Sequence, residues 1–166
     1  IEQRCNHTLH IFYVKIHAFH DFFYIHSVFF DSCKKIFLIY LNGIITVFAG
    51  SASRPFAQKM CDYLGVELGK STTHIFSEGG IYVRADESIR NKDVYIVQSI
   101  GKDPNNAFTE LIFWIDAFKR ASANSITAII PYFGYAKADK KDEPRVSIRA
   151  RVCADCIEMC GADRVV

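Results

Sequence analysis

A chain of 166 residues, half of them hydrophobic, is long enough to form one domain with a substantial core, and it is too apolar to be intrinsically disordered. A formal charge of only +2 predicts no general attraction to nucleic acid, so phosphate binding would have to be local. Six cysteines without a convincing secretory signal favour a reduced, cytosolic protein.

The histidines are concentrated near the start of the chain. Residues 1–43 hold five of the six histidines, seven of the fourteen phenylalanines and no proline. The pairs His7/His10 and His17/His20 have the i, i+3 spacing of one helix face, which a metal site could use. No ordered pattern of carboxylates or cysteines accompanies them, so a metal site is the weaker interpretation.

The same stretch makes a poor membrane anchor. Charged residues and histidines interrupt the apolar run 9–30, and the run 36–49 is too short to span a bilayer unaided. The residue mix is also what translation of AT-rich sequence upstream of a true start would give. We therefore expect residues 1–43 to be an extension outside the fold, and residues 44–166 to form the domain.

From residue 44 onward, strands and helices alternate. Pro55 suits the first turn of a helix, Asn106 can cap one, and Gly79-Gly80 mark a hairpin-like turn. This alternation predicts an α/β fold with a doubly wound, mostly parallel sheet and a small β-hairpin. The expected strands are 44–48, 74–76, 81–85, 94–98 and 126–130, with a last one beginning at Val165; the expected helices run from Pro55 to near Gly65, from Asn106 to about Ala121 and from Ser147 to Cys160.

Three cysteines, Cys153, Cys156 and Cys160, share one face of the last expected helix. A metal site would need a fourth ligand, and Cys61 and His74 lie in other elements. Free cysteines are common in cores because they behave as small hydrophobic side chains. We therefore expect these three to pack in the core.

The stretch PYFGYAKADKKDEPRVSI, residues 131–148, is the most informative part of the sequence. It follows the apolar run 126–130, and ligands of parallel α/β folds bind in loops after the carboxyl ends of strands. Its lysines and Arg145 suit a polyphosphate, since arginine grips phosphate with two donors and lysine acts as a movable point charge. Asp139 and Asp142 could hold a metal or orient the lysines. Composition alone also allows a solvated charged loop.

This segment resembles the ATP-binding stretch of the ribose-phosphate pyrophosphokinase (phosphoribosyl pyrophosphate synthetase) family. The resemblance covers nearly all of 44–166 and implies the phosphoribosyltransferase-like N-terminal domain of that family, truncated at its last strand. The similar segments, in the family's order, are VFAGSASRPFAQKM (47–60), GVELGK (65–70), IFSEGGIYVRADESIRNKDVYIVQS (75–99), ELIFWIDAFKRASANSITAIIPYFGYAKADKKD (110–142) and GADRVV (161–166).

The resemblance also implies an ATP site. Phe76 and Glu78 would meet the adenine, because a phenyl ring can stack on a base and a carboxylate can accept from its amino group. Lys137, Asp139 and Lys140 match the positions that meet the phosphates.

Three residues of this site depart from the family's pattern. The family usually has Glu in the place of Gly80, Arg in the place of Lys137 and often Gln in the place of Ala138. A lysine keeps the charge of arginine but loses its two-donor fork, so the grip on phosphate is expected to differ here.

A second set of residues matches family positions that line a regulatory phosphate or nucleotide site. The set is Ser88, Arg90, Lys141 and Arg145. Without the resemblance, these four are equally well explained as ordinary polar residues of the surface.

The family transfers the β,γ-diphosphate of ATP to ribose 5-phosphate, which gives phosphoribosyl pyrophosphate and AMP, and it requires magnesium. The resemblance therefore implies the N-terminal half of such an enzyme in a cytosolic homo-oligomer, without nucleic-acid or membrane partners. Most magnesium ligands, the ribose 5-phosphate loop and the catalytic histidine are expected beyond Val166, so we expect this chain alone to be inactive. Two interpretations stay open beside it: a non-catalytic associated subunit, and a generic nucleotide-binding module.

Overall fold

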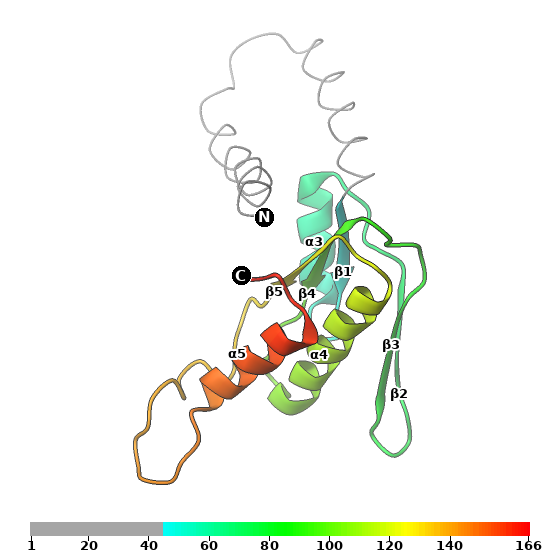
Figure 1. Cartoon of the computed structure of the whole chain (residues 1–166). Coiled ribbons are helices and arrows are strands. Elements are labelled where there is room, and N and C mark those ends of the chain that lie inside the picture. The colour runs from blue at the N-terminus through cyan, green and yellow to red at the C-terminus, as the bar shows by residue number, and fades with distance from the viewer. Residues whose placement is uncertain (1–44) are drawn as a thin grey trace, which may run out of the picture. The chain divides into compact units, whose positions relative to one another are not determined.

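The computed structural model of the protein describes residues 45–166 (Figure 1). The expectations for residues 1–43, namely the histidine pairs and the extension outside the fold, concern residues outside that range.

The main sheet of the described residues has four parallel strands. Their spatial order is β1 (Ile45–Ala49), β4 (Asp93–Val97), β5 (Ser125–Ile129) and β6 (Arg164–Val165). In the register, Thr46 lies beside Val94, which lies beside Ile126. β-branched and aromatic residues dominate the strand sequences, as parallel strands that are buried on both faces require.

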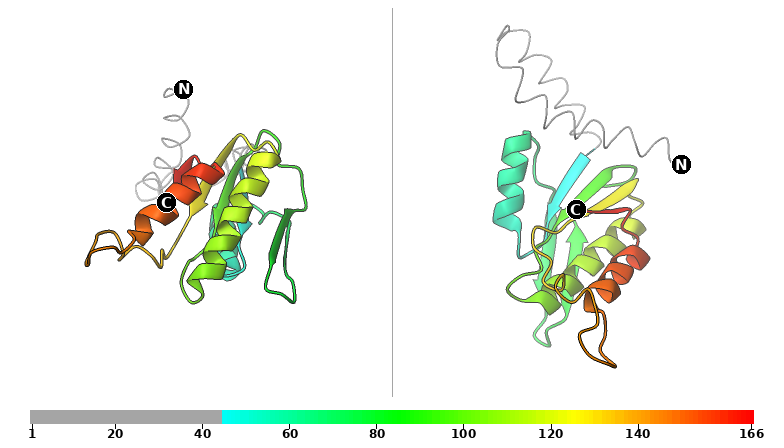
Figure 2. Two further views of the ribbon diagram at one scale, coloured as in Figure 1. Left: turned by 60° about the horizontal axis from the view of Figure 1, so that its bottom comes forward. Right: turned by 90° about the vertical axis from the view of Figure 1, so that its left-hand side faces the viewer.

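Helices cover both faces of this sheet (Figure 2). Helix α3 (Arg54–Leu64) covers one face, where Cys61 packs among Val47, Tyr95 and Val97. Helices α4 (Pro104–Arg120) and α5 (Arg149–Cys160) cover the other face, and their side chains pack among Phe48, Val94, Ile96, Ile126 and Ala128. Successive strand residues thus point to opposite layers. The predicted doubly wound α/β fold is confirmed.

A two-stranded antiparallel hairpin stands apart from the main sheet. It consists of β2 (Ser71–Ile75) and β3 (Ile81–Ala85), with Ile75 opposite Ile81. The hairpin docks on the domain through Val83 and Ala85, which pack against the core cluster that contains Trp114. Its two strands extend beside α4 in Figure 1. The predicted small hairpin is confirmed.

Two expected helix starts are wrong. Asp103, not Asn106, caps α4: its side chain accepts a hydrogen bond from the backbone N–H of Asn106 at 3.4 Å, and Pro104 occupies the first turn. The last helix begins at Arg149 rather than Ser147, and Ile148 at its start gives no side-chain cap. Both helices that end at glycine, α3 at Gly65 and α5 at Gly161, do so with a left-handed backbone, as expected.

The expectation for the cysteines of α5 is correct in part. Cys153 is buried, whereas Cys156 and Cys160 are only half-buried, and all three are free thiols. Residues 45–166 contain no group of three or more histidine, cysteine or acidic side chains that could hold a metal ion. The same range contains no helix long and apolar enough to cross a membrane.

Candidate functional site

Three loops follow the carboxyl ends of β1, β4 and β5 at one end of the domain: residues 50–53, 98–103 and 130–148. After β1 the chain enters α3 on one face of the sheet, and after β4 it enters α4 on the other face. Such a change of face between neighbouring strands marks the place where doubly wound folds bind their ligands. The topology therefore points to this end of the sheet.

A buried carboxylate fixes the first two of these loops. Glu110 of α4 is 3% exposed and accepts hydrogen bonds from the backbone N–H of Ser51 at 2.9 Å, from the Ser51 hydroxyl and from Gln98 Nε2 at 2.9 Å. The Oε1 of Gln98 accepts in turn from the backbone N–H of Ala52 at 3.3 Å. A buried carboxylate needs such partners to offset the loss of water. The loop after β1 is therefore held by α4.

This network was not predicted from the sequence, although the sequence holds one signal of it. Glu110 lies in the apolar stripe of α4, beside Leu111 and one turn before Trp114, whose Nε1 donates to it at 3.3 Å. A charged residue on the buried face of a helix needs hydrogen-bond partners, and Gln98 at the end of a buried strand is such a partner.

The tip of the hairpin carries two of the predicted site residues. The backbone N–H of Phe76 donates to Gly80 O at 2.8 Å, and that of Gly79 donates to Phe76 O at 2.9 Å. Gly79 has a φ of 87°, a conformation that favours glycine. Phe76 is 45% exposed, and Glu78 is also exposed. The rings of Phe76 and His74 are nearly perpendicular, with their centroids 4.9 Å apart. The tip is thus a well-defined turn that presents an aromatic ring and a carboxylate to solvent.

The first part of the 131–148 loop is anchored on the domain. Ile100 donates its backbone N–H to Tyr132 O at 2.7 Å. The rings of Tyr135 and of Phe108 in α4 are nearly perpendicular, with their centroids 6.4 Å apart. Gly134 passes so close to Ile100 that a Cβ there would lie 2.5 Å from its carbonyl oxygen. These contacts fix the stretch that leads into the charged residues.

The charged part of the loop projects away from the sheet (Figure 1). Lys137, Asp139, Lys140, Lys141 and Arg145 are all exposed. The backbone N–H of Ala150 donates to Ala138 O at 3.1 Å, which closes the loop at its base. A shallow hollow of about 460 Å³ lies within it, lined by Lys140, Asp142, Glu143, Val146, Ser147 and Arg149. The loop therefore offers cations and carboxylates together at the carboxyl end of β5.

Arg145 has an unusual backbone conformation within this loop. Its φ of 66° is in the left-handed region, which is costly for a residue with a Cβ. Residues in such conformations are concentrated at ligand-binding segments, where the surroundings hold them.

The structure keeps the hairpin tip and the charged loop apart. Both lie toward the end of the domain where the parallel strands finish, but on opposite sides of α4 (Figures 1 and 2). Within one chain, Phe76 and Glu78 therefore do not meet Lys137 or Lys140.

The four residues expected to line a regulatory phosphate or nucleotide site are also divided between two places. Ser88 and Arg90 precede β4, where Asn91 donates its backbone N–H to Ser122 O at 2.9 Å beside the C-terminal end of α4. Lys141 and Arg145 lie in the loop before α5, near the opposite end of the sheet. The four exposed side chains do not form one cluster within a single chain.

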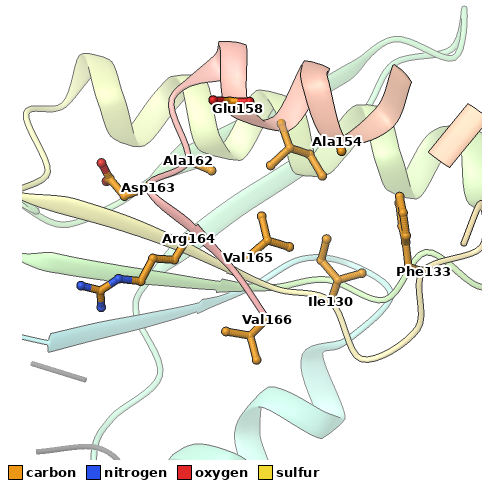
Figure 3. Close-up of a pocket in the computed structure, with 10 residues that line it drawn as sticks. Ile130, Phe133, Ala154, Glu158, Ala162, Asp163, Arg164, Val165 and Val166 are labelled. Carbon is orange, nitrogen blue, oxygen red and sulfur yellow. The ribbon is translucent and has the colours of Figure 1, made fainter. Parts of the chain in front are cut away.

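A larger hollow, about 520 Å³, lies between α5 and β6 and was not expected from the sequence (Figure 3). Its lining is mostly apolar, with Ile130 and Phe133 on one side, Ala154 of α5 on another, and Val165 and Val166 at the end of the chain. Its charged residues are Glu158, Asp163 and Arg164, and none of its lining belongs to the charged 137–145 stretch, so the hollow is distinct from the candidate site.

The fold and the position of the charged loop define a doubly wound α/β domain with an exposed charged loop after its third parallel strand. The family model described as the N-terminal domain of ribose phosphate pyrophosphokinase matches residues 45–161. The chain therefore belongs to the ribose-phosphate pyrophosphokinase family, of which it carries the N-terminal domain. This membership excludes the interpretation of the chain as a generic nucleotide-binding module outside that family.

Individual relatives agree with the family model. The ribose-phosphate pyrophosphokinase of Deinococcus radiodurans is 48% identical over 122 residues, which are 74% of this chain and 38% of that protein. That of Campylobacter jejuni is 49% identical over 119 residues, 72% of this chain and 38% of that protein. The crystal structure of phosphoribosylpyrophosphate synthetase from Mycobacterium smegmatis matches with a TM-score of 0.72 and 40% identity, over 74% of this chain and 41% of that one. The chain thus spans less than half the length of these relatives.

Proposed function

We propose that this chain supplies the nucleotide-binding half of a ribose-phosphate diphosphokinase, which transfers the β,γ-diphosphate of ATP to ribose 5-phosphate to make phosphoribosyl pyrophosphate and AMP for nucleotide synthesis. The observation that carries the proposal is the exposed cationic loop at the carboxyl end of β5, in a domain that belongs to this family. We assign no residue of 45–166 to ribose 5-phosphate.

The proposed role of the loop is electrostatic. Transfer of a phosphoryl group leaves little covalent chemistry to the protein, so positioning and charge neutralisation make up most of its contribution. Lys137 and Lys140 would stand beside the phosphates as point charges, and Asp139 would orient them or accept a metal. The exposure of all three side chains is compatible with direct contact to a ligand.

Magnesium is proposed to arrive with the nucleotide. This ion is usually held by one or two carboxylates together with substrate phosphates and water. The loop offers Asp139 and Asp142, and residues 45–166 hold no larger ligand group, so the donors present fit a shared site better than a metal cage made by the protein alone.

A homo-oligomer would explain why the predicted ATP residues are split within one chain. Phe76 and Glu78 are proposed to hold the base, and they lie across α4 from Lys137. One nucleotide could contact both sets only if two copies each contributed one of them. The same argument applies to the proposed regulatory phosphate site, in which Ser88 and Arg90 of one copy would face Lys141 and Arg145 of another.

The free thiols of residues 45–166 fit a reducing, cytosolic location. We also propose that residues 1–43 are an extension that the domain does not need.

A chimera tests the proposed activity. In the chimera, residues 45–166 of this chain replace the matched 122 residues of the Deinococcus radiodurans protein. The unaltered Deinococcus radiodurans enzyme serves as the positive control. We expect AMP formation that depends on both ribose 5-phosphate and magnesium. A chimera that is folded by circular dichroism and yet forms no AMP, beside an active control, would contradict the proposal.

A further inference from the structure

Lys137 lies in a short turn that is fastened at both ends. The backbone N–H of Ala138 donates to Tyr135 O at 3.0 Å, so residues 135–138 form a hydrogen-bonded β-turn with Lys137 inside it. Ala138 O in turn accepts from the backbone N–H of Ala150 in α5 at 3.1 Å. One end of the turn is therefore attached to α5.

Tyr135 attaches the other end of the turn to α4. Its hydroxyl donates to Asn105 Oδ1, and its ring lies nearly perpendicular to that of Phe108, with the two centroids 6.4 Å apart. The side chain is half-buried against the core cluster that contains Trp114. Tyrosine combines an apolar ring with a polar tip, so this one residue makes both an apolar and a polar contact with α4.

The point of attachment on α4 is itself fixed. Asn105 belongs to the first turn of this helix, where its backbone oxygen accepts from the Thr109 hydroxyl at 2.8 Å. The same helix is held to the sheet through Glu110, which accepts from Gln98 Nε2 at 2.9 Å. A hydrogen bond to a rigid helix restrains the group that it holds more closely than a bond to a loop would.

The side chain of Lys137, in contrast, is unrestrained. It is exposed and takes part in none of the ion pairs among residues 45–166. Because the stem of a lysine is flexible, the region that its charge can reach is set by where its backbone is held. A shift of the turn would move that region, and a charge that is misplaced relative to phosphate is less effective.

We propose that Tyr135 is a positioning residue for the ATP phosphates, which acts through its hydroxyl bond to Asn105 and thereby sets the place of the Lys137 turn. This inference rests on the proposed function, in which Lys137 stands beside those phosphates. The ring of Tyr135 stabilises the fold by its burial, whereas the hydroxyl bond adds a fixed direction to the chain that leads into the turn.

Tyr135→Phe separates these two contributions, because it removes the hydroxyl and keeps the ring. Tyr132→Phe is the matched control: Tyr132 lies in the same loop, is 58% exposed, and its hydroxyl makes no hydrogen bond within residues 45–166. In the chimera, we expect Tyr135→Phe to raise the KM for ATP about three- to tenfold. The KM for ribose 5-phosphate should stay unchanged, and Tyr132→Phe should alter neither constant.

Two double variants test the route of the effect. Asn105→Ala should repeat the rise in the KM for ATP, and combining it with Tyr135→Phe should add nothing further, since both remove the same bond. In a Lys137→Ala background, Tyr135→Phe should change the KM for ATP by no more than about 1.5-fold, because the side chain that it positions is gone. A residue that served only the stability of the fold would not show this dependence on Lys137.

Hydrogen exchange in the 166-residue protein measures the turn without any activity. The amide of Ala138, which donates to Tyr135 O, should exchange at least about threefold faster in Tyr135→Phe and at the normal rate in Tyr132→Phe. Equal exchange rates in the two variants would show that the hydroxyl does not hold the turn, and would overturn the inference.

The kinetic outcomes separate the inference from the proposed function. If Tyr135→Phe changes the KM for ATP no more than Tyr132→Phe does, the role of Tyr135 is wrong and the proposed function stands. An effect of undiminished size in the Lys137→Ala background would likewise overturn the role of Tyr135, because it would not act through Lys137. A folded but inactive unaltered chimera would overturn the proposed function, and the inference would fall with it.

Discussion

Gln98 and Glu110 hold each other inside the domain, with Gln98 Nε2 2.9 Å from Glu110 Oε2 and the two residues 0% and 3% exposed. Gln98 directly follows β4, and Glu110 lies in α4. Between them they bind the backbone of Ser51 and Ala52, so that the loop after β1 is positioned by a polar contact in the middle of an apolar layer. A network of this kind is stabilising only while every member has its partners.

Removing Glu110 should therefore be costly. Glu110→Ala leaves the backbone N–H of Ser51 and the indole N–H of Trp114 without their acceptor, leaves Gln98 Nε2 only its 3.4 Å bond to Ala107 O, and opens a cavity. We expect a loss of about 3–5 kcal/mol in the free energy of unfolding, measured in urea. Glu67→Ala, at an exposed position, should change it by no more than about 0.5 kcal/mol. Equal effects of the two substitutions would show that the buried network is not formed.

Gly50 is fitted to the same network. A Cβ at this position would lie 2.3 Å from Oε1 and 2.5 Å from Cδ of Gln98, whereas a Cβ at Gly101 meets nothing closer than 3.6 Å. We expect Gly50→Ala to destabilise the domain by about 1–3 kcal/mol and Gly101→Ala to be nearly neutral.

A double-mutant cycle isolates the cause. In a Gln98→Ala background the clash is gone, so Gly50→Ala should cost clearly less than it does alone. Strict additivity of the two changes would mean that the backbone of residue 50, rather than Gln98, requires glycine.

The main architecture could be predicted from the sequence because strand and helix periods are local. The runs 94–98 and 126–130 each differ from the observed strand by one residue at either end. Helix starts were less predictable, since several residues before α4 and α5 can act as the N-cap, and backbone geometry decides which of them does. Asp103 rather than Asn106 is the N-cap of α4 because Pro104 fits the first helical position directly after it.

That cap gives a third prediction. Asp103 accepts from the backbone N–H of Asn106 at 3.4 Å and from its Nδ2 at 2.7 Å. We expect Asp103→Ala to lower the free energy of unfolding by about 1 kcal/mol and Asn106→Ala by less, because only the first leaves the helix start without an acceptor. Thermal unfolding of both variants measures the difference, and the reverse order would contradict the cap assignment.

The cysteines give a prediction about reactivity. Burial raises the pKa of the Cys61 thiol, with a smaller contribution from the charge of Asp62. The neutral thiol is thus favoured in the fold, so near pH 8 Cys61 is both shielded and protonated. We expect iodoacetamide to label Cys61 at least a thousandfold more slowly than half-buried Cys156, by peptide mapping at pH 8. Similar rates in the native protein would indicate that α3 does not cover the sheet stably.

The candidate site was harder to predict than the fold. The sequence indicated which residues belong to exposed loops, and Phe76, Glu78 and Lys137 are indeed exposed. It could not indicate that the hairpin docks on α4 through Val83 and Ala85, because that contact joins elements far apart in the chain. This docking places the hairpin tip across α4 from the charged loop, so the predicted ATP residues are not neighbours within one chain.

The charged loop gives the last prediction, in the chimeric enzyme. Lys137 and Lys102 are both exposed lysines in loops after parallel strands, the first after β5 and the second after β4. If the 131–148 loop binds the phosphates, Lys137→Ala removes a charge-assisted contact worth about 1.5–3 kcal/mol, which is roughly a tenfold to hundredfold loss in kcat/KM for the nucleotide. Lys102→Ala should leave kcat/KM within about twofold.

Lys137→Arg should retain or raise activity, because a guanidinium can bind two phosphate oxygens at once. Kinetics in which the nucleotide is varied at saturating ribose 5-phosphate measure all three, and equal losses for the two alanine variants would mean that this loop is not the phosphate site.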